Sequence, residues 1–132
     1  MSEDRLKGAG MSPVAKSAAA FAVYLSGMGL ALLAIPGNFR DLIGLPPADD
    51  LYLRLVGAIA IALGIYYAAA ARDENVPFLR STVPARVWVL VAFTSIALLS
   101  GEPILILFGL ADAAFAAWTW NALRAADRIV AT

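Results

Sequence analysis

Four long apolar stretches constrain this chain more than any other feature. They cover residues 14–35, 51–71, 83–100 and 103–123. An α-helix rises about 1.5 Å per residue, so roughly 20 residues cross a hydrocarbon layer of about 30 Å. The third stretch is marginal, because Arg86 lies within it and only residues 87–99 are free of charge. We therefore expect its N-terminal end in the headgroup region with Trp88 as an interfacial anchor. The pattern predicts an all-α, four-helix transmembrane bundle.

Composition agrees with a membrane protein and removes several functional classes. Hydrophobic residues make up 61% of the chain, against about 45–50% in a soluble domain. The chain has no cysteine and no histidine, which excludes disulfides, thiol redox chemistry, imidazole-ligated haem and a conventional zinc site. The formal net charge is zero, so nothing favours nucleic acid as a partner. We therefore expect no metal, no cofactor and no catalytic residue.

The basic residues predict the orientation of the helices. Eight of the ten lie on the side that holds both termini and the loop between the second and third stretches, and only Arg40 and Arg54 lie on the other. This positive-inside bias places both termini in the cytoplasm. We expect a disordered cytoplasmic leader over residues 1–12, a transmembrane domain over residues 13–124 and a cytoplasmic tail over residues 125–132.

Two of the stretches carry ridges of small residues at helical spacing. Small residues let helix backbones approach closely in a membrane, so these ridges should face the bundle. Bulky neighbours such as Leu55, Ile59, Leu107 and Phe115 should largely face elsewhere. The ridges consist of Arg54, Gly57, Ile61, Gly64 and Ala68 in the second stretch, and of Leu105, Gly109, Asp112, Ala116 and Thr119 in the fourth.

The long connection between the first two stretches mixes apolar and charged residues between Phe39 and Leu45. The spacing is compatible with a short surface helix that dips Phe39, Leu42 and Ile43 toward the acyl chains. Such a helix would act as a lid over the outer mouth of the bundle, but a compact loop with no moving part is the favoured interpretation.

Asp112 is the most informative residue in the sequence. It lies nine positions after Pro103, roughly 13–14 Å into the fourth helix. An ionised carboxylate at that depth is costly, so it should face the interior, find a partner or take up a proton. The best candidate partner is Arg54, which lies in an antiparallel helix at a depth that differs by about 9 Å.

Two interpretations of this pair remain open. In the structural one, Arg54 and Asp112 join Ser26, Thr94, Ser95 or Tyr66 in a polar cluster that fixes helix register. In the functional one, they line an outward-opening cavity that binds a polar head group or exchanges a proton. The candidate ligand-binding residues are Asp112, Arg54, Gly57, Gly109, Glu102 and Tyr66. Solvation also explains Glu102, and an aromatic belt also explains Tyr66.

Several segments resemble a group of small bacterial four-helix membrane proteins. They are residues 42–47 (LIGLPP), 54–57 (RLVG), 64–67 (GIYY), 77–80 (PFLR) and 108–112 (FGLAD), followed by Trp118. The group looks loosely like the DoxX and BphX proteins. The resemblance implies four helices, a bacterial inner membrane and an interest in Arg54, Gly57 and Asp112, but it supplies no reaction.

These observations favour a non-enzymatic membrane binding or accessory protein. Near Arg54 and Asp112 it would hold a lipid-like or small hydrophobic ligand, or a partner helix, with a homo-oligomer or a membrane subunit as possible partners. A proton-coupled small-molecule transporter acting as a homodimer is the first alternative. An integral membrane enzyme acting on an isoprenoid or lipid, with Asp112 or Glu102 as acid or base, is the second.

Overall fold

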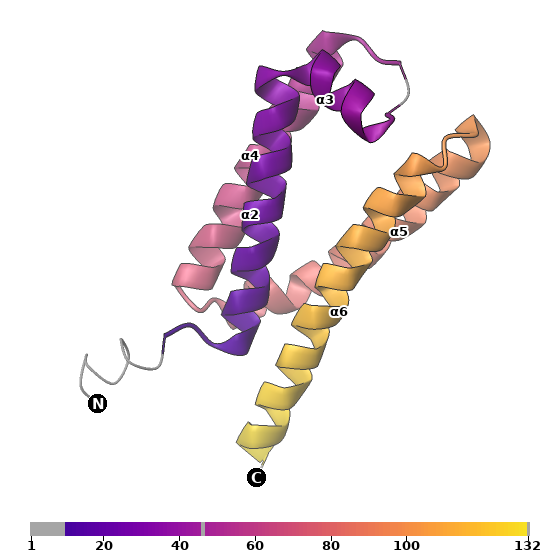
Figure 1. Cartoon of the computed structure of the whole chain (residues 1–132). Helices are drawn as coiled ribbons and strands as arrows, with labels where there is room; N and C mark the ends of the chain where they lie inside the picture. Colours follow the sequence, from indigo (N-terminus) through magenta and orange to yellow (C-terminus); the bar gives the residue numbers. More distant parts are fainter. Residues whose placement is uncertain (1–9, 46, 132) are drawn as a thin grey trace.

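The computed structural model describes residues 10–45 and 47–131, with side chains as far as Ile129. Regular structure in this part of the chain is entirely helical (Figure 1). Four helices are long and apolar enough to cross a membrane. The helices are α2 (Pro13–Ala34), α3 (Pro36–Ile43), α4 (Asp50–Arg72), α5 (Val76–Ser100) and α6 (Ile104–Ala131).

Side-chain caps fix where three of these helices begin. The Ser12 hydroxyl accepts the Ala15 N–H at 3.1 Å at the start of α2. The Asp49 carboxylate accepts the Leu51 N–H at 2.9 Å at the start of α4, and Asn75 caps α5. Each cap satisfies a backbone donor that has no partner within its helix.

Helices α5 and α6 are longer than the apolar stretches that predicted them. Helix α5 begins at Val76 instead of residue 83, and α6 continues to Ala131 instead of ending at residue 123. Pro84 lies inside α5. The added turns carry charged residues, and Arg80 and Asp127 form an ion pair at 2.9 Å. Because these turns are polar, hydropathy detected only the apolar part of each helix. The predicted tail is thus helical as far as Ala131, and residues 1–9 of the predicted leader lie outside the described residues.

The connection after α2 contains a helix, so the favoured expectation of a compact loop is wrong. Helix α3 ends at Gly44, whose φ of +76° suits a residue without a Cβ. The Arg40 side chain donates a hydrogen bond to the Ala48 carbonyl at 3.0 Å, which ties α3 to the segment that leads into α4. Phe39 is half-buried, whereas Leu42 is 82% exposed.

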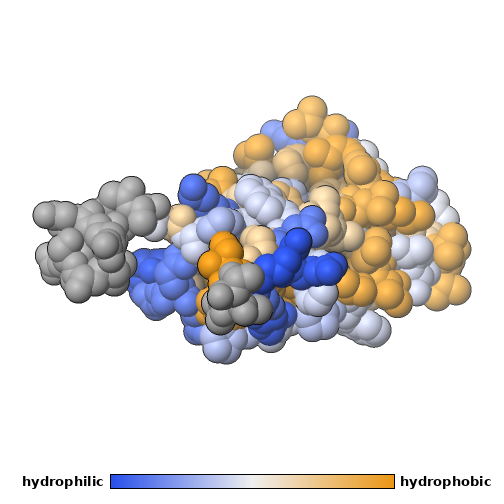
Figure 2. All heavy atoms as spheres, turned by 90° about the horizontal axis from the view of Figure 1, so that it is seen from below, coloured by the Kyte–Doolittle hydropathy of each residue, from blue (hydrophilic) through white to orange (hydrophobic). Residues whose placement is uncertain are grey.

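The long helices form two hairpins, α2 with α4 and α5 with α6. The hairpins lie close together at the end of the molecule that holds both described chain ends, and they diverge toward α3 and the α5–α6 turn (Figure 1). The turn between α4 and α5 lies at the same end as the termini, as the sequence predicted. Seen from that end, hydrophilic residues gather near the centre and hydrophobic ones cover the adjoining side (Figure 2).

Close backbone approach holds the first hairpin together. A Cβ on Gly57 would lie 2.5 Å from the Gly29 carbonyl oxygen, and one on Gly29 would lie 2.6 Å from the Gly57 carbonyl oxygen. Gly64 is also buried, facing Ser26. The predicted inward face of α4 is therefore confirmed at its glycines, while Arg54 and Ala68 are exposed.

The predicted inward face of α6 is confirmed at Gly109, Ala116 and Thr119, which are buried. Phe115 differs from the expectation that it faces away, because its ring lies 5.1 Å from that of Phe21 and helps to fill the junction between the hairpins.

Candidate functional site

A buried arginine lies where the two hairpins meet. Arg86 on α5 is only 2% exposed. Its Nε donates to the Thr82 carbonyl at 3.3 Å, and its Nη2 donates to the Thr82 hydroxyl at 2.9 Å. The same Nη2 donates to the Thr119 hydroxyl on α6 at 3.0 Å. Arg86 therefore connects α5 to α6 from inside the protein.

A row of hydroxyl groups continues from Arg86 to α2. The Ser17 hydroxyl lies 2.7 Å from that of Thr119 and donates to the Val14 carbonyl at 2.7 Å. A hydroxyl has one proton, so Thr119 is the donor to Ser17, and its lone pair is left for Arg86. This order gives both fully buried hydroxyls a hydrogen-bond partner.

Aromatic rings surround the Arg86 guanidinium. Its Cζ lies 4.9 Å from the centroid of Phe21 and 5.5 Å from that of Tyr67. The faces of aromatic rings attract cations, which offsets part of the cost of burying the charge. One nitrogen, Nη1, is buried and has no hydrogen-bond partner among the described residues.

Above this polar junction, a groove opens between the diverging hairpins. Its volume is about 440 Å³. Helix α3 and the segment after it contribute Phe39, Leu45 and Ala48 to its wall. The remaining lining residues are Tyr24, Leu25, Met28, Leu32, Leu53, Val56, Leu63, Val89, Phe93, Leu105, Phe108 and Asp112, so the groove is apolar except for one carboxylate and one phenol.

Asp112 and Val89 locate the inner end of the groove. Val89 follows Arg86 by three residues, which is about one helical turn. Asp112 precedes Thr119 by seven residues, or two turns on the same face of α6. Both lie on the side of the junction toward the opening, so the Arg86 cluster lies beyond the inner end of the groove.

Asp112 is half-buried and makes no hydrogen bond or direct ion pair with the described residues. The charged side chain that acts on it electrostatically is Arg86. The two groups make no direct ion pair among the described residues.

The structure does not bring Arg54, the expected partner, to Asp112. Arg54 is exposed and has no ion pair or hydrogen bond within the described part of the chain. Sequence reasoning missed Arg86 because it placed the start of the third helix too late. With α5 beginning at Val76, Arg86 lies ten residues, or about 15 Å, along the helix. Asn75 and Pro77 are the cap and first-turn signals that indicate this earlier start.

The other predicted site residues lie apart from Asp112 or serve packing. Gly57 contacts Gly29, and a Cβ on Gly109 would lie 3.2 Å from the Leu90 side chain. Glu102 is half-exposed at the α5–α6 turn. Tyr66 is 61% exposed, while its neighbour Tyr67 turns inward and is 7% exposed.

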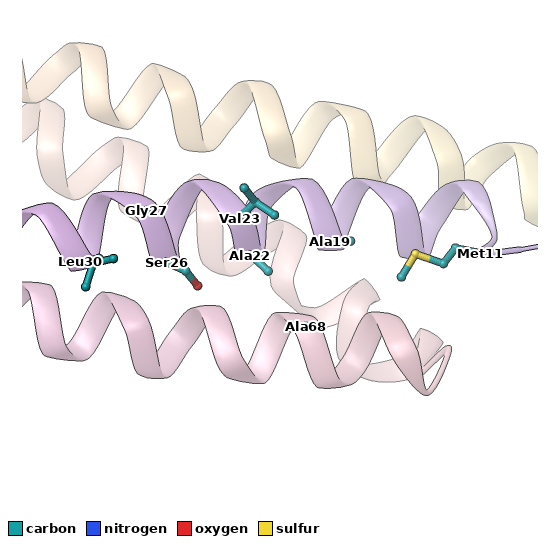
Figure 3. A pocket seen from close by; sticks show the side chains of 8 residues that line it. All are labelled: Met11, Ala19, Ala22, Val23, Ser26, Gly27, Leu30 and Ala68. Atoms are coloured by element: carbon teal, nitrogen blue, oxygen red, sulfur yellow. The ribbon is translucent and has the colours of Figure 1, made fainter.

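A second hollow, with a volume of about 520 Å³, lies along the outer face of α2 (Figure 3). It is lined by Met11, Ala19, Ala22, Val23, Ser26, Gly27, Leu30 and Ala68. Figure 3 shows the side chains of Ser26 and Leu30 directed toward α4 and that of Val23 directed away from it. None of these lining residues carries a charge, so this hollow is typical of a lipid-facing surface.

The groove therefore combines apolar walls, one half-buried carboxylate and a buried cation beyond its inner end. This arrangement is suited to binding an apolar molecule whose polar end reaches the inner end. The chain matches no protein-family model, no curated protein and no solved structure.

Proposed function

We propose that this protein is a non-enzymatic integral membrane binding protein that holds a lipid-like or small hydrophobic ligand in the groove between its hairpins. The observation that carries the proposal is Asp112, a half-buried carboxylate that has no hydrogen-bond partner among the described residues and lies in a groove whose other lining residues are apolar except for Tyr24. Buried polar groups in membranes are costly and mark functional sites. A volume of about 440 Å³ falls within the size range of small-molecule sites.

Size favours a small ligand over a partner helix. One helical turn, with a diameter of about 10 Å and a pitch of 5.4 Å, occupies about 420 Å³. The groove, at about 440 Å³, has room for little more than one such turn. The Arg86 cluster closes the inner end, so a transmembrane helix could not pass through. A flexible apolar chain is restricted by neither the volume of the groove nor its closed inner end.

We place the protein in a bacterial inner membrane with both termini in the cytoplasm and the groove in the outer half. The bias of basic residues toward the side of the termini supports this orientation. The resemblance to the DoxX and BphX groups supports a location in the bacterial inner membrane. In this orientation the groove accepts ligands from the outer leaflet.

Two tryptophan substitutions on α5 test the proposal. Val89 lines the groove, whereas Val91 on the same helix is 51% exposed and lies outside it. Purified wild type, Val89→Trp and Val91→Trp would be compared by native mass spectrometry for lipids that co-purify. We expect Val89→Trp to lose a bound molecule that wild type and Val91→Trp retain. Equal retention in all three proteins would overturn the proposal.

A further inference from the structure

Four aromatic side chains line the same groove as Asp112, and each comes from a different helix. They are Tyr24, Phe39, Phe93 and Phe108, on α2, α3, α5 and α6. All four are half-buried, so each keeps surface that a molecule in the groove can contact. Among the described residues that line the groove, Asp112 is the one that carries a charge. The groove therefore offers aromatic rings and a single negative charge.

Two of these rings lie close to Asp112 on the side of the opening. Phe108 precedes Asp112 by four residues on α6, so the two side chains are neighbours on one helix face. Phe93 faces α6 at Gly109, where an added Cβ would lie 3.4 Å from the Phe93 Cβ. Gly109 precedes Asp112 by three residues, or about one turn.

A third ring approaches Asp112 from the other hairpin. The Tyr24 ring lies 5.4 Å from the ring of Phe115, measured between centroids. Phe115 follows Asp112 by three residues, which places it one turn closer to the junction on α6. The Asp112 carboxylate therefore has aromatic neighbours on both sides along the groove.

The buried cation of the junction does not enter this site. Arg86 is 2% exposed and is not one of the residues that line the groove. Its guanidinium donates to Thr119 and lies against Phe21 and Tyr67. A bound molecule therefore contacts the Asp112 carboxylate and the groove rings without contacting the guanidinium.

A carboxylate among aromatic rings is complementary to a positive charge. Aromatic faces attract cations, and the attraction is stronger where water is excluded. An ionised carboxylate in apolar surroundings is costly without a partner, and a cationic head group supplies that partner. An anionic head would be repelled by Asp112, and a neutral head would leave its charge uncompensated.

We propose that the groove selects lipophilic cations, with the positively charged head among the rings beside Asp112 and the apolar part along the walls. This proposal rests on the proposed function and adds the charge class of the ligand. The chemistry it favours is an amphiphile with an ammonium head and no negative charge, which sets aside phospholipids and fatty acids.

Three probes with the same decyl chain test the proposal. Decyltrimethylammonium is a fixed cation and decyl sulfate is an anion. The tert-butyl analogue, in which carbon replaces the nitrogen, is neutral and has the shape of the cation. Each would be titrated into purified full-length protein in nonionic detergent, and bound molecules would be counted by native mass spectrometry. We expect wild type to bind the cation about tenfold more tightly than either other probe.

Three variants assign the preference to the carboxylate and the rings. Asp112→Asn removes the charge at nearly constant size, so the cation should lose its advantage over the neutral analogue. Phe108→Leu keeps an apolar wall without a ring, so the cation should bind severalfold more weakly while the neutral analogue is unaffected. Asp73→Asn is the matched control, because Asp73 is exposed at the turn between α4 and α5 and does not line the groove. It should bind all three probes as wild type does. If Asp112→Asn does not fold, Phe108→Leu still tests the selection.

The outcomes separate this proposal from the proposed function. If the cation and its neutral analogue bind equally well to wild type and Val89→Trp abolishes the binding of both, the groove binds apolar chains but the charge selection is wrong. A wild-type preference for decyl sulfate, or a cation preference that survives Asp112→Asn, would also overturn the selection alone. If Val89→Trp binds all probes as wild type does and retains the same co-purifying lipids, both proposals are wrong.

Discussion

The hydroxyl oxygens of Ser17 and Thr119 lie 2.7 Å apart, although the residues are separated by 102 positions in the sequence. Both side chains are completely buried. Their hydrogen bond joins the first membrane-crossing helix to the last and extends through Thr119 to Arg86. Polar groups thus join the two hairpins at their junction beside the apolar packing of Phe21 against Phe115, while close glycine contact acts within the first hairpin.

We predict that Thr119→Val destabilises the protein more than Ser17→Ala. Removing the Thr119 hydroxyl leaves both Ser17 and Arg86 short of a partner, which costs about 1–3 kcal/mol. Removing the Ser17 hydroxyl breaks one hydrogen bond between helices, worth about 0.6–2 kcal/mol in a membrane. Reversible unfolding in mixed detergent micelles measures both. Thr94→Val is the control, because Thr94 is half-buried and makes no side-chain hydrogen bond among the described residues. Equal losses in all three variants would contradict the prediction.

Alanine at Gly57 should disrupt the first hairpin, whereas alanine at Gly27 should not. The new Cβ at position 57 would lie 2.5 Å from a backbone oxygen of Gly29, which a side-chain movement cannot relieve. Overpacking of this kind costs about 1–3 kcal/mol. A Cβ at Gly27 meets nothing within 4 Å. The same unfolding assay compares the two variants, and similar stabilities would argue against close packing of α2 on α4.

The sequence was sufficient for the number of membrane-crossing helices and for the inward face of their glycines. The sequence pattern placed Arg54 on the inward face of α4 because the predicted ridge began at Arg54 instead of Leu53. Leu53, Gly57, Ala60 and Gly64 are buried, and at about 100° per residue their centre lies near Leu53. Arg54 lies about 100° away from that direction, outside the helix contact. A shift of one residue in the predicted inward face was therefore enough to place Arg54 wrongly.

Arg86 and Phe115 could not be placed from local pattern because their positions depend on other helices. Arg86 is stabilised by Thr119 from α6 and by the rings of Phe21 and Tyr67 from the other hairpin. An arginine near the start of an apolar stretch is equally typical of the membrane surface. Tyr66 and Tyr67 pose the same problem, since an aromatic belt explains either one, and only packing shows that Tyr67 turns inward.

Cysteine labelling should establish the orientation in the membrane. The chain has no cysteine, so single substitutions give unambiguous signals. In bacterial cells that express the protein, a membrane-impermeant maleimide should label Glu102→Cys but not Arg128→Cys, because Glu102 lies at the α5–α6 turn and Arg128 near the end of α6. Permeabilised cells, in which both sites should react, are the control. The reverse pattern in intact cells would invert the proposed topology.

Two arginines on α5 provide the final comparison. Arg80 is paired with Asp127 at the exposed end of the helix, where an ion pair contributes about 0–1 kcal/mol. Arg86 is 2% exposed and connects α5 to three other helices through a hydrogen bond and ring contacts. Removing one member of a buried charged network costs about 3–5 kcal/mol. We therefore expect Arg86→Ala to lower the free energy of unfolding several times more than Arg80→Ala.

Arg86→Lys refines this comparison, because it keeps the charge but loses the planar fork. A lysine ammonium is a compact point charge, so it cannot donate to Thr82 and Thr119 while stacking on two rings as the guanidinium does. We expect its unfolding free energy to fall between those of wild type and Arg86→Ala, measured under the same conditions. Wild-type stability in Arg86→Lys would mean that charge alone is sufficient at the junction, and the hydroxyl row from Ser17 through Thr119 would then not depend on guanidinium geometry.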